Sequence, residues 1–160
     1  MHNPTTVERA SDREMVVTRT FNAPARLVFK AWSSPELMMR WWTPKSFGIT
    51  FVSCEADVRT GGTYRFVFSH PDFEQPMAFF GKYVEVIPNA RIVWTNDEAG
   101  EAGQVTTLTF AEEGGRTLLV MHELYPSKEA LDAAGTGASE VMPETFQQLD
   151  ELLARRPAGD

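Results

Sequence analysis

Cysteine, basic runs and long apolar runs are all scarce in this chain. Its 160 residues contain one cysteine, Cys54, which excludes an internal disulfide framework and suits a reducing compartment. The net charge of −7, without any cluster of Lys and Arg, disfavours binding to nucleic acid phosphates. No apolar run is long enough to cross a bilayer, and residues 1–12 lack the profile of a signal peptide. We therefore expect a cytoplasmic protein with no nucleic-acid partner and no membrane insertion.

Residue patterns that carry known chemistry are missing as well. The three histidines show none of the paired His or Cys spacings that bind metals, so no metal site is expected. Signatures of a serine nucleophile, a dinucleotide fold and a phosphate-binding loop are absent too, so no cofactor is expected. The sequence shows no catalytic residue set. It leaves enzymatic activity undecided and favours non-enzymatic binding.

Aromatic residues are the abundant feature: eleven phenylalanines, four tryptophans and three tyrosines. Two of the tryptophans, Trp41 and Trp42, are adjacent at the end of a short apolar segment. Adjacent side chains on a helix point about 100° apart, so the two rings need different environments. We expect one indole in the core and the other near the mouth of any cavity. The alternative is that both indoles are core anchors.

Short helices are predicted near the N-terminus and a longer one at the C-terminus. Residues 22–34 form an amphipathic segment with Asn22 as its N-cap, and a second start follows, capped by Ser33 or Ser34. Pro44 ends that second helix. The longest helix is expected over residues 140–154, where apolar residues recur at helical spacing. Ser127 can cap an earlier helix start.

Strands account for most of the remainder. A first strand is predicted over residues 13–21, and residues 49–124 show two-residue alternation interrupted by turn residues, which predicts about six antiparallel strands. Segregated strands and helices indicate the α+β class. We expect a flexible N-terminal tail over 1–12, a single domain over 13–155 and a polar tail over 156–160. A helix is only about 10–12 Å wide, so one helix cannot by itself fill a broad curved sheet.

Four segments resemble one known family. They are "FNAPARLVFKAWSSPELMMRWWTP", "CEADVRTGGTYRF", "GKYVEVIPNARIVWT" and "TLTFAEEGGRTLLVM". In this order they are similar to the START-like or SRPBCC superfamily, and within it to the bacterial branch related to the C-terminal domain of the activator of the heat-shock protein 90 ATPase. The resemblance implies the helix-grip fold: a curved antiparallel sheet wrapped around a long C-terminal helix, two short helices between strands 1 and 2, and a hydrophobic cavity between sheet and helix.

One position departs from the family pattern. Relatives carry Gly-Trp near the start of the last helix, whereas this chain has Val141-Met142 followed by Pro143. The change removes a large aromatic ring from the expected cavity lining, and the proline is expected to bend or restart the helix.

The function favoured by the resemblance and the aromatic content is binding of a small apolar or amphipathic molecule in that cavity. His70 and His122 are predicted polar contacts, with solvated strand ends as the alternative for both. The residues predicted to line the cavity are Trp42, Phe66, Phe68, His70, Phe80, His122, Met142 and Phe146.

Two other functions stay open. One is a protein-interaction module with the chaperone as partner, although the eukaryotic activators carry an N-terminal domain for which 160 residues leave no room. The other is a cyclase-like or hydrolase-like enzyme, which a buried His or carboxylate with a shifted pKa facing the cavity would indicate. The sequence leaves the oligomeric state open, a homodimer included.

Overall fold

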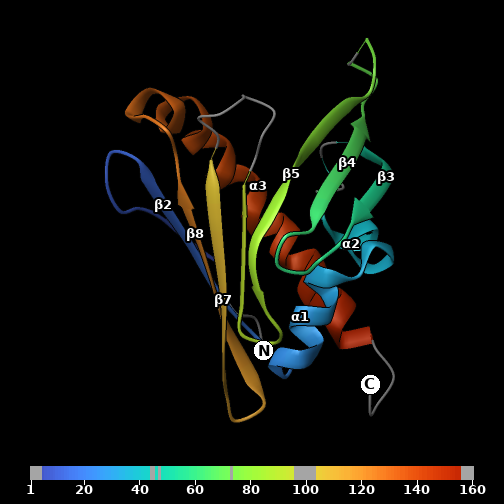
Figure 1. Cartoon of the computed structure of the whole chain (residues 1–160), viewed down its shortest axis with the longest axis vertical. Coiled ribbons are helices and arrows are strands. Elements are labelled where there is room, and N and C mark those ends of the chain that lie inside the picture. The colour runs from blue at the N-terminus through green and yellow to red at the C-terminus, as the bar shows by residue number, and fades with distance from the viewer. Residues whose placement is uncertain (1–4, 44–45, 47, 73, 96–103, 156–160) are drawn as a thin grey trace.

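The protein folds as an eight-stranded antiparallel sheet with three helices (Figure 1). The structure, a computed structural model, describes residues 5–43, 46, 48–72, 74–95 and 104–155, and the side chains of all of these except 133–142 and 155. The elements are β1 (Thr6–Arg9), β2 (Glu14–Phe21), α1 (Ala25–Ser33), α2 (Pro35–Trp41), β3 (Thr50–Ala56), β4 (Thr63–Ser69), β5 (Met77–Ile87), β6 (Arg91–Thr95), β7 (Val105–Glu113), β8 (Arg116–Leu124) and α3 (Lys128–Arg155). The predicted helix-grip α+β fold is confirmed.

Strand order in the sheet is β1-β2-β8-β7-β6-β5-β4-β3. Strand β2 therefore lies between the edge strand β1 and the last strand β8, and the hairpins between β3 and β8 supply the remaining neighbours. Strand β1 lies within the segment predicted to be a flexible tail. That expectation is corrected for residues 6–9, because they pair with Met15–Thr18 of β2.

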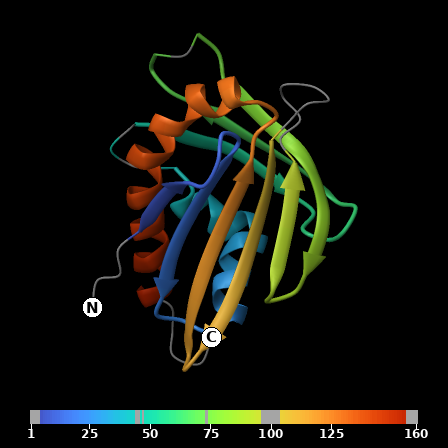
Figure 2. The same cartoon turned by 90° about the vertical axis from the view of Figure 1, so that its left-hand side faces the viewer.

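The sheet curves, as Figure 2 shows. Register shifts between Phe51 and Ser53 in β3 and between Tyr83 and Glu85 in β5 increase the local twist. Gly81 allows close backbone approach in β5, because a Cβ atom there would lie 1.8 Å from the carbonyl oxygen of Thr95. The curvature creates a concave face.

The short helices follow the predicted boundaries with one corrected cap. Helix α1 starts after Pro24 without a side-chain cap, so Asn22 is not its N-cap. Helix α2 takes the second of its two predicted starts, with Pro35 in its first turn and the Ser34 hydroxyl accepting a hydrogen bond from the Leu37 amide. Both helices lie beside α3 at one end of the sheet (Figure 1).

Helix α3 is longer than predicted. It starts at Lys128, where the Ser127 hydroxyl accepts a 3.1 Å hydrogen bond from the Ala130 amide, and runs 28 residues to Arg155. Pro143 lies inside this one helix, so the predicted restart does not occur. Phe146, Leu149 and Leu153 are buried, and α3 packs against β1, β2 and α2. Helix α3 thus covers the end of the sheet that contains β1 and β2, and β3 to β6 lie toward the other end of the strand order (Figure 2).

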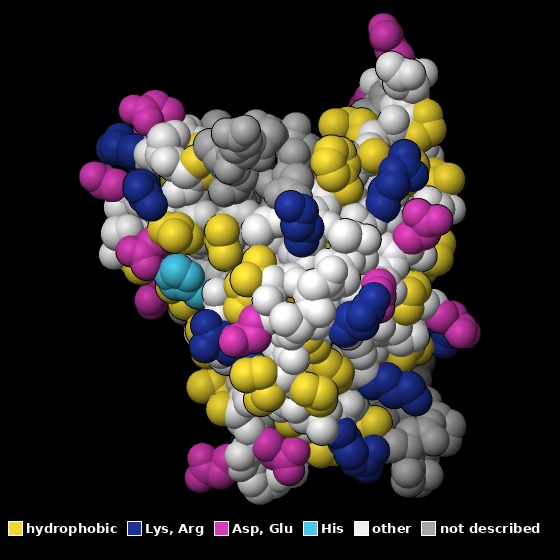
Figure 3. All heavy atoms as spheres, viewed as in Figure 1, with side chains coloured by type: hydrophobic (Ala, Val, Ile, Leu, Met, Phe, Trp, Pro, Cys, Tyr) yellow, Lys and Arg dark blue, Asp and Glu magenta, His cyan; other side chains and the backbone are white. Residues whose placement is uncertain are grey.

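The molecular surface is mixed in charge. On the face seen in Figure 3, Lys and Arg lie among Asp and Glu, with apolar side chains scattered between them. Within the part of the chain that the structure describes, every helix is too short or too polar to cross a membrane.

Candidate functional site

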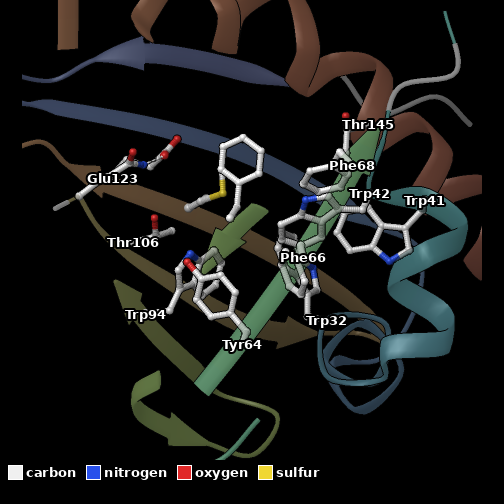
Figure 4. A pocket seen from close by; sticks show the side chains of 13 residues that line it. Trp32, Trp41, Trp42, Tyr64, Phe66, Phe68, Trp94, Thr106, Glu123 and Thr145 are labelled. Atoms are coloured by element: carbon white, nitrogen blue, oxygen red, sulfur yellow. Dashed lines mark hydrogen bonds between the residues drawn. The ribbon is translucent and has the colours of Figure 1, made fainter. Parts of the chain in front are cut away.

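A cavity of about 290 Å³ opens between α1, α2, α3 and the inner face of the sheet. Its wall is mostly aromatic, and Figure 4 shows the tryptophans of α1 and α2 at one end and Glu123 with Thr106 at the other. The lining residues are Trp32, Trp41, Trp42, Tyr64, Phe66, Phe68, Phe79, Trp94, Gln104, Thr106, Met121, Glu123 and Thr145.

The adjacent tryptophans have different environments. Trp41 is 1% exposed, and its indole N–H donates a 3.1 Å hydrogen bond to the Ala31 carbonyl. Trp42 is only partly buried and meets Phe66 edge to face, with 5.2 Å between ring centroids. Trp41 therefore anchors the core at its α1–α2 junction, and Trp42 forms part of the more open wall.

Three of the predicted lining residues come together at the cavity: Trp42, Phe66 and Phe68. Phe146 is fully buried below it, edge to face with Phe21 and Trp32, and belongs to the core. Met142 lies outside the residues whose side chains are described.

Phe80 was predicted in the lining and lies on the other face of the sheet. In the register between β4 and β5, Phe79 pairs with the inward-facing Phe66, and Phe80 pairs with the exposed Arg65. Phe79 contacts Phe68 at 5.4 Å between ring centroids and lines the cavity in place of Phe80. Tyr83 is buried and shares the parity of Phe79, so the two lie on the same inner face of β5.

Both histidines lie outside the cavity. His122 lies on the outer face of β8, where its Nε2 is 2.7 Å from a carboxylate oxygen of Glu14. His70 follows the end of β4, and its Nδ1 accepts a 3.0 Å hydrogen bond from the Asp72 amide. The expectation that they contact a cavity ligand is corrected by these positions.

Glu123, the residue after His122, points to the inside instead (Figure 4). A side-chain oxygen of Glu123 accepts a hydrogen bond from the side-chain amide of Gln104, and the Tyr125 hydroxyl donates another. Burial raises the pKa of Glu123 to about 7, against the smaller lowering effects of Gln104, His122 and Tyr125. In the sequence, Glu123 lies two and four residues after Met121 and Leu119, so the three share one face of β8. The residues of the other face are apolar enough to form an inner face too, so the sequence alone does not single out Glu123.

The free energy of unfolding of Glu123→Gln, relative to that of the parent, is expected to be higher at pH 8 than at pH 4. The folded carboxyl keeps its proton up to about pH 7, whereas the unfolded one loses it near 4.5, so the parent loses stability as pH rises between these values. One pKa unit corresponds to about 1.4 kcal/mol, so the variant should gain about 3 kcal/mol over this range. Urea unfolding of both proteins at pH 4, 6 and 8 measures the difference.

Glu14→Gln is the matched control for that measurement. Its carboxylate is exposed on the outer face, and hydrogen bonds from His122 and then Ser11 hold the pKa of Glu14 below its ordinary value. A lowered pKa makes the charged form stabilising above the ordinary pKa, so this variant should gain nothing at pH 8. A pH-independent difference between Glu123→Gln and the parent would show that Glu123 titrates as a solvated carboxyl.

Two buried polar atoms in the cavity wall have no hydrogen-bond partner within the described chain. They are Nε1 of Trp32 on α1 and the hydroxyl of Thr145 on α3, in residues that are 4% and 2% exposed. Leaving a buried donor unpaired costs about 1–3 kcal/mol. Neither residue has a sequence signal that separates it from a core position.

Other reactive groups are weak candidates. Burial raises the pKa of the Cys54 thiol to about 11, so it stays protonated at neutral pH and is a poor nucleophile. Across the described residues, His, Cys, Asp and Glu form no group of three that could hold a metal ion.

Comparison with known proteins places the fold and the family. The family model described as "Activator of Hsp90 ATPase homolog 1-like protein" matches residues 22–154. No protein of curated function matches the chain.

Solved structures share the fold along nearly the whole chain. A crystal structure from Rhodobacter sphaeroides is 24% identical with a TM-score of 0.86, covering 96% of this chain and 99% of that one. Protein Ms6760 from Mycobacterium smegmatis is 25% identical with a TM-score of 0.78, covering 94% and 98%. An AHSA1-like protein from Aeromonas hydrophila is 16% identical with a TM-score of 0.71, covering 91% and 100%.

Proposed function

The chain belongs to the family of activator of Hsp90 ATPase homolog 1-like proteins, and we propose that it binds a small molecule with an aromatic or apolar body in the cavity between sheet and helices. The observation that carries this proposal is the cavity itself. Its aromatic walls come from α1, α2 with its C-cap, and the three strands β4, β5 and β6, and they leave about 290 Å³ between them.

The size suits a small ligand. Engineered apolar cavities of about 150 Å³ bind benzene, so about twice that volume accommodates a body of roughly two fused rings. Ligand sites are mostly apolar with a few placed polar groups, which describes this wall. Rings at 4.7–6.1 Å between centroids around Trp32 give a rigid surface against which a flat molecule can stack.

The unpaired polar atoms also favour a ligand. The indole N–H of Trp32 is a donor, and the hydroxyl of Thr145 can donate or accept. A bound molecule or water that pairs with them removes the penalty of leaving them unpaired. Native mass spectrometry of freshly purified protein tests whether a molecule is retained.

Filling the cavity should weaken binding. Thr106 lines the cavity from β7 and is buried, so Thr106→Phe places a ring in the ligand volume. The affinity for 1-naphthylmethanol, measured by isothermal titration calorimetry, is expected to fall about tenfold or more. Thr107→Phe is the matched control, because Thr107 is the next residue on β7 and has the opposite parity. Equal affinity in both variants, each shown to be folded by its melting transition, would contradict binding in this cavity.

Acid–base catalysis is a second candidate, favoured by Glu123. A carboxyl in a cavity with a pKa of about 7 has both protonation states available at neutral pH. If the protein is an enzyme, a molecule identified by mass spectrometry should be converted on incubation, and Glu123→Gln should abolish conversion even when the variant is saturated with that molecule. Conversion unaffected by that substitution would exclude this role.

A further inference from the structure

The charge in the cavity has one sign. Among the described side chains lining it, Glu123 supplies the single carboxylate, and none is Lys, Arg or His. The nearest histidine in sequence, His122, faces the opposite side of the sheet and is engaged with Glu14. An ionised Glu123 therefore has hydrogen-bond donors but no cation within the described cavity wall.

Neighbouring residues hold Glu123 in position. Its strand partners are Thr106 on β7 and Met15 on β2, and Met15 packs with Tyr125 in a small buried cluster. The Gln104 amide and the Tyr125 hydroxyl both donate to the carboxylate. Thr106 and Glu123 are directly across from each other on β7 and β8, where Cβ atoms are about 4.5–5.5 Å apart, so the Thr106 hydroxyl can serve as a second acceptor at this end of the cavity (Figure 4).

Aromatic rings surround the rest of the volume. Trp94 lies between the Glu123 end and Trp32, with 6.0 Å between the two indole centroids, and Tyr64 lies beside Trp94 (Figure 4). The faces of such rings carry negative potential and attract cations within about 6 Å. Carboxylate and rings thus favour the same ligand charge, and both disfavour an anion.

We propose that the ligand is an amine: an ammonium group bound at the Glu123 carboxylate and the Thr106 hydroxyl, attached to an apolar body of one or two rings among the tryptophans. This inference rests on the proposed function, since it specifies what the same cavity binds. The ammonium supplies the positive charge that the cavity wall lacks, and its N–H donors suit the two acceptors. A ligand carboxylate would face Glu123 and be repelled.

Three compounds with the same ring body test the charge preference. Calorimetric titration at pH 8, above the pKa of about 7 of Glu123, compares 1-naphthylmethylamine, 1-naphthylmethanol and 1-naphthoic acid. The amine is expected to bind the parent about tenfold more tightly than the alcohol, in line with a charge-assisted hydrogen bond, and the acid most weakly. Glu123→Gln should reduce the affinity for the amine to that for the alcohol and leave the alcohol unchanged.

Glu14→Gln is the control for a general charge effect. It removes one negative charge near the same strand but on the outer face, so the preference for the amine should persist. If alcohol and acid bind the parent as tightly as the amine, while Thr106→Phe still weakens all three, the cavity binds ligands and the amine inference is wrong. If none of the three binds, or if Thr106→Phe changes nothing, the proposed function itself fails.

Discussion

Trp41→Ala is expected to lower the free energy of unfolding by about 4 kcal/mol. The indole is almost completely buried, contacts Trp32 edge to face at 4.7 Å between ring centroids, and donates a hydrogen bond to the Ala31 carbonyl. Truncation removes these contacts, leaves the carbonyl unpaired and creates a void at the α1–α2 junction. Urea unfolding monitored by circular dichroism measures the loss.

Trp42→Ala is the matched comparison, since it removes the same ring one residue later. Trp42 is only partly buried, so we expect roughly half the loss of stability. Its ring forms part of the cavity wall against Phe66, so this variant should also bind 1-naphthylmethanol more weakly. Equal losses of stability in the two variants would show that both indoles are core anchors.

Asp150→Ala is expected to destabilise the fold by about 3 kcal/mol or more. Asp150 on α3 accepts a 2.9 Å hydrogen bond from the guanidinium of Arg19 on β2, whose side chain is 1% exposed. The same guanidinium nitrogen donates to Gln147, and Nη1 donates to Thr5. Removal of the carboxylate leaves a buried positive charge without its counter-ion between helix and sheet, and urea unfolding measures the cost.

Two further variants separate the buried charge from the loss of a side chain. Glu36→Ala breaks the exposed pair of Glu36 with Arg40 and should change stability by less than about 1 kcal/mol. The double substitution Arg19→Met with Asp150→Leu removes both charges and should recover most of the loss. An effect of Asp150→Ala no larger than that of Glu36→Ala would show that Arg19 remains solvated.

The fold could be predicted because each element has its own local signal. Alternation in residues 63–70, glycines at the hairpins and the Ser34-Pro35 helix start each act over a few residues, and the structure retains them. The helix start at Ser127 was predicted and is confirmed, but its continuity with residues 140–154 was not predicted, because residues 128–139 contain few large apolar side chains. Strand β1 escaped because its pairing with β2 is a tertiary contact.

The cavity residues could be predicted only where one parity of a strand is plainly apolar. Trp42, Phe66 and Phe68 met that condition. In β5 and β8 both parities carry apolar residues, so the sequence pattern alone predicts Phe80 as readily as Phe79 and His122 as readily as Glu123. A shift of one residue changes the face of every side chain in a strand, and neighbouring strands decide which alternative is realised.

By itself the sequence determined the class of fold, the order of helices and strands and the aromatic character of the interior, because these follow from short-range periodicity and turn residues. Only the tertiary structure decided that a volume of about 290 Å³ stays open and that Glu123, Trp32 and Thr145 border it. Empty space and unpaired polar atoms depend on how far distant segments approach one another. No local pattern of residues specifies that distance.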